Sequence, residues 1–334
     1  MNLTDNDHLR DFVTSSAKNF GQTGWNVPVV SFGGAALSGE GGGYGFGLVT
    51  KKEAEELVNF AFDLGITVFD TAPIYGFGLS EQRLGEFLRG KREKVYLTSK
   101  SGVTWSSSKR VNMTNDPKIT EEMLEQSLKD LRTDYIDLYF IHWPDAHVDI
   151  RKPLEVLAKY QSKGIIKKIG LCNTNLDDLA KAKEITTIDV IQSEYNLFNR
   201  KAEAEIFPYC AKNNSAFMAW GPLDKGALTG NYDLKRTYED CDARKNAPWF
   251  KKSDHEKKVL TVEKMKKLLP ENTTMMELIN SFYQSQLELS TILVGAKSPE
   301  KLKQYLSSMI KKTTLWDNFS EKDTFLELAQ HWSH

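Results

Sequence analysis

The sequence is poor in cysteine, in charge of one sign and in long hydrophobic runs. Among its 334 residues there are three cysteines, and 44 basic side chains nearly balance 45 acidic ones. The cysteines lack the spacing of a redox pair or a metal site, so we expect neither, and a reducing, cytoplasmic setting is predicted. The balanced charge, with no long run of one sign, gives no reason to expect a nucleic-acid partner.

No stretch approaches the roughly 18 apolar residues of a membrane span. The polar N-terminus, with Asp5 and Asp7, also lacks the basic and then apolar order of a signal peptide. We therefore expect no membrane partner.

With 40% apolar residues, the chain has enough apolar side chains to bury a large core. We predict one domain over 1–334: an N-terminal extension at 1–24, a barrel at about 25–310, and a C-terminal helix or tail at 311–334.

Short β-branched and aromatic runs alternate with longer amphipathic stretches along most of the chain. The runs are too short for buried helices and have the composition of buried strands. They lie at 27–32, 66–69, 95–98, 136–141, 165–171, 190–192, 216–220 and 291–294. The stretches between them have apolar residues at three- and four-residue spacing, and Thr50 and Thr120 are predicted to cap two of these helices.

Alternating strands and helices fit either a closed barrel or an open dinucleotide-binding sheet. The open sheet should carry a G-x-G-x-x-G turn after its first strand, and the glycine-rich loop at 33–47 contains no such window. We therefore predict an α/β fold, a (β/α)₈ TIM barrel, with this loop at the catalytic rim. The long charged connection at 223–255 is predicted to form a lid.

Four polar residues lie at or just after the ends of predicted strands: Asp70, Tyr75, Lys100 and His142. Each alone is commonplace, as a helix cap, a packing residue or a solvated charge, but in a barrel the carboxyl ends of the strands meet. An ammonium close to the phenol would lower its pKa from the usual ~10, and the carboxylate would keep the lysine charged. The imidazole would orient a substrate oxygen. Together these groups predict a proton donor for reduction of a carbonyl.

The stretch at 65–76 resembles the signature of the aldo-keto reductase family that contains its catalytic Asp and Tyr. Further matches follow in the family's order, at 98–100, 141–144, 170–173, 192–196, 220–223 and 295–300. The motifs are most similar to the branch with aldose 1-dehydrogenase-like and channel beta-subunit-like members. This resemblance implies catalytic roles for Asp70, Tyr75, Lys100 and His142.

The same resemblance implies a site for NADP(H), with NAD(H) as the alternative. Asn173 and Gln192 match the positions that hold the nicotinamide carboxamide, beside Cys172, where the family usually has serine; Trp220 matches the aromatic residue that stacks on the nicotinamide. The positions implied for the pyrophosphate and adenosine are Gly221, Leu223, Lys225, Gly295, Lys297, Ser298, Lys301 and Gln304. Of these, Lys297, Ser298 and Lys301 would meet the 2′-phosphate. Gln304 and Tyr305 replace the usual adenine-binding pair.

Three functions remain open at this point. The expected one is reduction of a small aldehyde or ketone. Residues 75–81 are similar to those of family members that oxidise aldose sugars at carbon one, and other members are cofactor-binding regulatory subunits of ion channels. Four aromatic residues, Trp25, Phe77, Trp105 and Trp143, are expected to line the substrate mouth.

Overall fold

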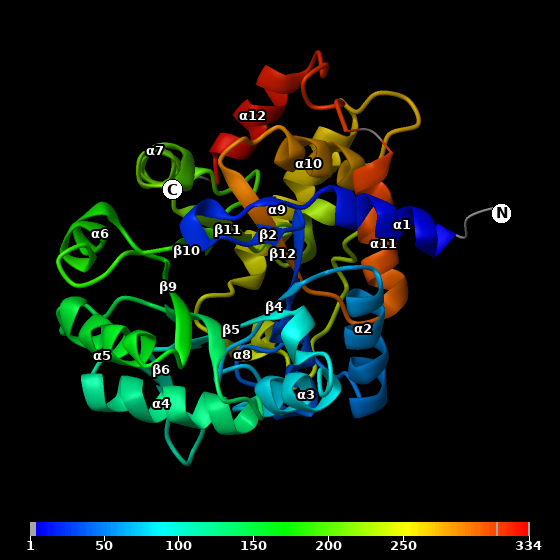
Figure 1. The fold of residues 1–334 in the computed structure, drawn as a ribbon. Helices are drawn as coiled ribbons and strands as arrows, with labels where there is room; N and C mark the ends of the chain where they lie inside the picture. Colours follow the sequence, from blue (N-terminus) through cyan, green and yellow to red (C-terminus); the bar gives the residue numbers. More distant parts are fainter. Residues whose placement is uncertain (1–4, 312, 333–334) are drawn as a thin grey trace.

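The computed structural model describes residues 5–311 and 313–332. These residues form a closed barrel of eight parallel strands, as Figure 1 shows. This confirms the predicted (β/α)₈ architecture. In order around the barrel the strands are β3 (Val30–Gly33), β4 (Val68–Asp70), β5 (Tyr96–Ser101), β8 (Ile136–Ile141), β9 (Ile166–Cys172), β10 (Val190–Glu194), β11 (Ala216–Trp220) and β12 (Leu289–Val294), which pairs back onto β3.

A layer of helices surrounds the barrel (Figure 1). It comprises α2 (Lys51–Asp63), α3 (Leu79–Phe87), α4 (Pro117–Asp130), α5 (Arg151–Ser162), α6 (Leu176–Ala182), α7 (Ile206–Asn213), α10 (Met275–Gln284) and α11 (Pro299–Ile310).

Thr50 caps α2 as predicted, in a reciprocal capping box with Glu53. The prediction that Thr120 caps α4 is wrong. Asp116 accepts hydrogen bonds from two amides of the first turn, because Pro117 starts the helix three residues before Thr120.

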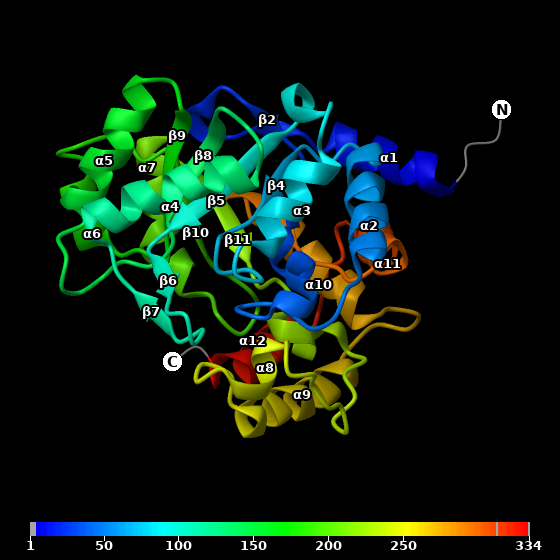
Figure 2. The ribbon, with the colours of Figure 1, turned by 90° about the horizontal axis from the view of Figure 1, so that it is seen from below.

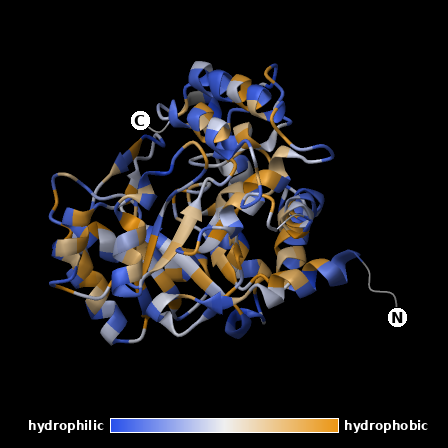
Figure 3. Cartoon of the chain, turned by 90° about the horizontal axis from the view of Figure 1, so that it is seen from above, coloured by the Kyte–Doolittle hydropathy of each residue, from blue (hydrophilic) through white to orange (hydrophobic). Residues whose placement is uncertain are grey.

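The strands are buried on both faces, so they carry nearly continuous apolar runs; every residue of β8 is buried. One apolar cluster lies between strands and helices, and a second, including Leu138, Phe140 and Met218, fills the barrel interior. A side chain at Gly170 would begin 2.3 Å from the Phe140 ring, so glycine makes room for that ring. Figure 3 shows the apolar strands at the centre and polar residues on the outer faces of the helices.

The amino ends of the strands are closed by the first segment of the chain. After α1 (Asp5–Ser15), the strands β1 (Lys18–Asn19) and β2 (Asn26–Val27) pair antiparallel. Trp25 stacks on Tyr96, with ring centroids 4.3 Å apart, at the first residue of β5. The expectation that Trp25 lines the substrate mouth is therefore wrong, because Lys100 lies near the opposite end of the same strand.

The carboxyl ends carry the longest insertions. The hairpin β6 (Val103–Trp105) and β7 (Val111–Met113) follows β5, whereas α8 (Ala243–Asn246) and α9 (Lys252–Lys266) follow β11. The predicted lid contacts the glycine-rich loop: the Ala243 amide donates to the Gly45 carbonyl at 2.9 Å. In Figure 2, α8, α9 and the terminal α12 (Lys322–Gln330) lie together at one edge. In the described part of the chain, every helix is too short or too polar to span a bilayer.

Candidate active site at the carboxyl ends of the strands

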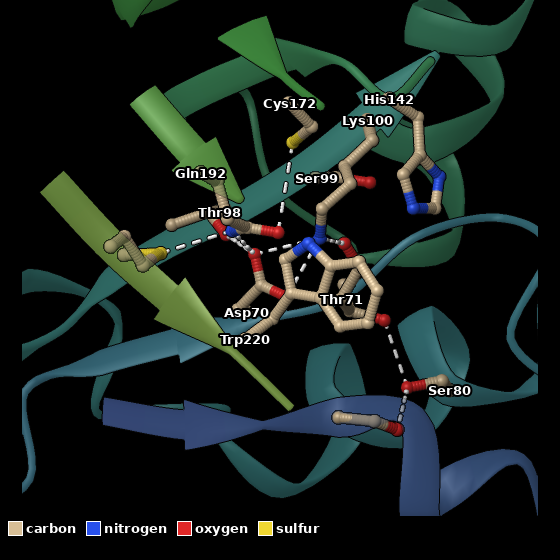
Figure 4. A network of polar contacts seen from close by, with 12 residues as sticks. Asp70, Thr71, Ser80, Thr98, Ser99, Lys100, His142, Cys172, Gln192 and Trp220 are labelled. Atoms are coloured by element: carbon tan, nitrogen blue, oxygen red, sulfur yellow. Dashed lines mark hydrogen bonds and ion pairs between the residues drawn. The ribbon is translucent and has the colours of Figure 1, made fainter. Parts of the chain in front are cut away.

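A fully buried ion pair lies at the centre of the barrel mouth (Figure 4). The Lys100 ammonium is 2.7 Å from both carboxylate oxygens of Asp70, and it also donates to the Thr71 carbonyl at 2.8 Å. The Asp70 carboxylate in turn accepts from Thr98 Oγ1 at 2.6 Å and from Gln192 Nε2 at 3.0 Å. The carboxylate and the ammonium are thus both fixed by several partners, from β5, from the loop after β4 and from β10 across the barrel, as a buried charge pair requires.

Tyr75 and His142 complete the predicted set. The Lys100 nitrogen lies 5.4 Å from the centroid of the Tyr75 ring, and the rings of Tyr75 and His142 meet edge to face with centroids 6.0 Å apart. His142 follows β8 and is anchored by its backbone, since its amide donates to the Ser101 carbonyl at 2.8 Å. The structure therefore brings together all four residues that the sequence singled out from separate strand ends.

The phenol of Tyr75 differs from the expectation in its acidity. Burial raises the pKa of Tyr75 to about 12, and the nearby Lys100 ammonium, which lowers it, offsets only part of this. The negative charge of Asp70 also raises the phenol pKa and so opposes Lys100. The lysine does act in the predicted direction, but desolvation is the larger effect. Tyr75 is consequently protonated at neutral pH.

The other two ionisable groups have defined charge states. Burial alone would lower the pKa of Lys100, but the contacts with Asp70 outweigh it, and the pKa is raised. Burial, together with the charge of Lys100, holds the pKa of His142 well below its usual range. The site at neutral pH therefore contains a charged Lys100, a neutral imidazole and a neutral phenol.

Two side-chain amides lie beside the ion pair, at the ends of β9 and β10. Asn173 donates to the His142 carbonyl and accepts from the indole nitrogen of Trp220, each at 3.0 Å. Gln192, besides its bond to Asp70, lies 3.6 Å from the Cys172 sulfur. Asn173 adopts a left-handed conformation, with φ of 52°, which asparagine tolerates better than most residues. These amides and the indole form one continuous polar wall next to Lys100.

The loop after β11 is fixed by charges. Lys225 pairs with Glu194 at 2.6 Å and with Asp224 at 3.2 Å, and Lys258 of α9 binds the other oxygen of Asp224 at 2.6 Å. The ammonium of Lys225 is thus paired with carboxylates, and its carbonyl accepts a hydrogen bond from Arg244 at 3.3 Å. Gly221, with φ of 69°, and Leu223 connect this loop to Trp220.

The predicted adenosine segment follows β12. Ser298 caps α11 and accepts from the Lys301 amide, while the Lys301 ammonium lies 3.3 Å from Gln304. Lys297 is half-buried and makes no ion pair with any residue of the described ranges; Gly295 approaches Gly33 of the first barrel strand. Tyr305 is a core residue, because its ring is buried on the inner face of α11. Its neighbour Gln304 is exposed.

Sequence reasoning missed the residues that support the set from behind. Thr71 donates to Ser80 Oγ at 2.8 Å, and Ser80 donates to the Gly34 carbonyl at 2.9 Å. Figure 4 shows these two contacts of Ser80, which connect the loops after β3 and β4. The Ser80 amide also donates to the Tyr75 carbonyl, in the loop after β4, at 3.1 Å. The only signal in the sequence was the proximity of these residues to Asp70 and Tyr75.

Comparison with known proteins identifies what this site resembles. The sequence model of the Aldo/keto reductase family matches residues 29–320. The chain is 33% identical over 290 residues to aldo-keto reductase YhdN of Bacillus subtilis, covering 86% of this chain and 87% of that protein. It is 30% identical over 259 residues to the NADH-specific methylglyoxal reductase of Escherichia coli, covering 73% and 79%. The structure of glycerol dehydrogenase AKR11B4 from Gluconobacter oxydans matches with a TM-score of 0.79 at 28% identity, over 96% of this chain and 97% of that one.

Proposed function

The chain belongs to the aldo/keto reductase family, and from this premise we propose that it reduces an aldehyde or ketone with NADP(H), using Tyr75 as the general acid. Membership makes it a nicotinamide-dependent oxidoreductase. The observation that supports the rest is the convergence of Tyr75, Lys100, Asp70 and His142 beside the two amides at the mouth of the barrel.

The residues present suit a nicotinamide. Two side-chain amides match the hydrogen-bonding groups of its carboxamide, and the half-buried Trp220 offers an aromatic face to its ring. We propose that Asn173 and Gln192 bind the carboxamide, exchanging their present partners for it, and that Trp220 stacks on the ring. When bound, the cofactor supplies hydride to the carbonyl carbon.

The chain's own residues manage the proton. Tyr75 gives its hydroxyl proton to the carbonyl oxygen, and the neutral imidazole of His142 donates a hydrogen bond that orients this oxygen toward the phenol. The Lys100 ammonium stabilises the phenolate left behind, and Asp70 keeps this ammonium charged and in place. Burial of the site strengthens each of these interactions, since water is excluded from them.

The preference for NADP(H) over NAD(H) is supported by Lys297. Burial lowers the pKa of this lysine, and the charges of Glu239 and Asp242 oppose this without either carboxylate forming an ion pair with Lys297 in the described ranges. A bound 2′-phosphate would provide a direct anionic partner. Ser298 and Lys301 begin the adjacent helix, whose amino end favours an anion. The similarity to an NADH-specific reductase favours the opposite preference, so both cofactors belong in the test.

The test is a steady-state assay of reduced nicotinamide consumption with a panel of aldehydes, ketones and free sugars. We expect reduction of at least one aldehyde or ketone, with a lower KM for NADPH than for NADH. Lys297→Met should reduce the affinity for NADPH and leave that for NADH nearly unchanged. Activity confined to oxidation of sugars or polyols would contradict the proposed direction. Tight cofactor binding without turnover in either direction would instead favour a regulatory subunit.

A further inference from the structure

The mouth beside Tyr75 is walled by aromatic side chains. Phe77, Trp105 and Trp143 pack with Tyr75 against a small buried cluster that includes Ile74 and Val103. The rings of Phe77 and Trp105 meet with centroids 5.2 Å apart. Phe77 lies two residues from Tyr75 in the same loop, and the hairpin β6–β7 brings Trp105 to it. This wall offers an apolar, aromatic surface to the body of a substrate whose carbonyl lies at Tyr75.

A cation is held at the outer edge of this wall. The Lys109 ammonium lies 5.0 Å from the centroid of the Phe77 ring, at the tip of the β6–β7 hairpin. The tip is a closed turn, since the Lys109 amide donates to the Ser106 carbonyl at 2.8 Å and the Ser106 amide donates to the Arg110 carbonyl at 3.0 Å. The turn therefore fixes where the backbone of Lys109 stands, even though its side chain is exposed.

This positive charge is not compensated locally. Neither Lys109 nor Arg110 forms an ion pair within residues 5–311 and 313–332. Deeper in the site, Lys100 is matched by Asp70, and His142 is neutral. On the facing lid, Asp240 is already paired with Lys245. An anion arriving at the mouth would thus meet a free ammonium on the hairpin and a net neutral centre.

We propose that Lys109 is a specificity-determining residue that selects carbonyl substrates bearing an anionic group at the end remote from the carbonyl. The body of such a substrate packs against Phe77 and Trp105, and its anionic group pairs with the ammonium of Lys109. An ammonium resting on an aromatic face keeps its outer side available for a second partner. This inference rests on the proposed reductase activity and adds a substrate class to it.

The test compares two aldehydes of nearly the same shape and size, the anionic 4-carboxybenzaldehyde and its neutral amide, 4-formylbenzamide. The measured quantity is the ratio of their kcat/KM values within each variant. For the wild type we expect a preference for the carboxylate of about two- to fivefold at low ionic strength, the range of an exposed ion pair, and a smaller preference in added salt. Lys109→Met should bring the ratio close to one, because Met keeps the packing on Phe77 without the charge.

Lys118→Met is the matched control. Lys118 is a similarly exposed lysine in the first turn of α4, away from the aromatic wall, and its removal should leave the ratio at the wild-type value. A wild-type ratio of one or less, or a preference that survives in Lys109→Met, overturns this inference while reduction of the amide upholds the reductase activity. Failure to reduce either aldehyde, together with the whole substrate panel, overturns both.

Discussion

At Tyr75, burial and a neighbouring cation act on one phenol in opposite directions. Desolvation raises the pKa to about 12 although Lys100 lowers it. A proton donor has to hold its proton until the substrate arrives, and this balance ensures that at neutral pH. The Lys100 ammonium stabilises the phenol oxygen more strongly as negative charge develops on it. Its electrostatic stabilisation is therefore larger in the transition state than in the resting site.

Glu81 is a second buried acid, on the other side of β5 from the mouth. It accepts from Ser99 Oγ at 2.6 Å, but its second oxygen has no hydrogen-bond partner within the described ranges. Burial raises the pKa of Glu81 to about 7 from an ordinary value of 4.5, against the opposing hydrogen bond from Ser99. Between these values the folded protein binds more protons than the unfolded chain, so this residue makes the free energy of unfolding fall as the pH rises.

Glu81→Gln should remove that dependence. Relative to the wild type, its free energy of unfolding should rise between about pH 5 and pH 8, by about 3 kcal/mol at most, because one pKa unit is worth ~1.4 kcal/mol. Denaturant titrations at several pH values measure this difference. Glu86→Gln is the control on the same helix, where the carboxylate is exposed and paired with Lys51, and no such rise is expected. A constant difference between wild type and Glu81→Gln across the range would contradict the assignment.

At the scale of elements, two tryptophans that were both expected at the substrate mouth lie at opposite ends of the barrel. Trp25 stacks on Tyr96 at the amino end of β5, whereas Trp105 meets Phe77 beyond its carboxyl end. Their different roles follow from which end of a strand each loop joins, because in this fold the carboxyl ends carry chemistry and the amino ends carry stability.

Trp25→Ala should therefore reduce stability without changing catalysis. Loss of a stacked, partly buried ring should lower the free energy of unfolding by about 2 kcal/mol. The value of kcat/KM for a good aldehyde should stay at the wild-type level, whereas Trp105→Ala should reduce it. Thermal unfolding measures the stability of both variants, and steady-state kinetics measure their kcat/KM. A loss of kcat/KM in Trp25→Ala without a loss of stability would contradict the placement of Trp25 at the amino end.

The barrel strands were predictable because their residues carry a local signal. Runs such as Ile136–Ile141 are too short and too β-branched to be buried helices, and the structure forms a strand over those very residues. Local signals fail where two patterns compete. Thr120 looked like a cap because it precedes an apolar helical face, but the Asp116–Pro117 pair starts α4 earlier and satisfies its first amides.

The candidate site divides in the same way. Asp70, Lys100 and His142 were recognisable because each lies at or just after the end of a strand, and strand ends meet in a barrel whatever the intervening sequence. Ser80 was not recognisable, since its role depends on a hydrogen bond to the carbonyl of Gly34, which lies 46 residues away in the sequence. The pKa of Tyr75 could not be predicted from the sequence either. It is set mainly by how deeply the phenol is buried, and only the packed structure defines that depth.

For the whole molecule, closure of the sheet is what turns separate residues into one site. Lys100 and Asp70 are thirty residues apart in the chain but in ion-pair contact, because β4 and β5 are neighbours in the barrel. The long insertion after β11 is fixed to this framework at Asp224, which Lys258 of α9 binds, and at the glycine-rich loop, which Ala243 contacts. The mouth is thereby bounded by segments from both halves of the chain.

The central claim is that the phenol of Tyr75 donates a proton in a pocket shared with the nicotinamide. The most direct measurement is single-turnover reduction by Tyr75→Phe, with NADPH affinity determined in parallel by fluorescence titration. We predict nearly unchanged cofactor affinity and a rate lowered by at least ~10²–10⁴-fold, the loss expected for a general acid. Tyr209→Phe, on the outer helix α7, should match the wild type in both. A Tyr75→Phe protein that reduces aldehydes at the wild-type rate would contradict the account.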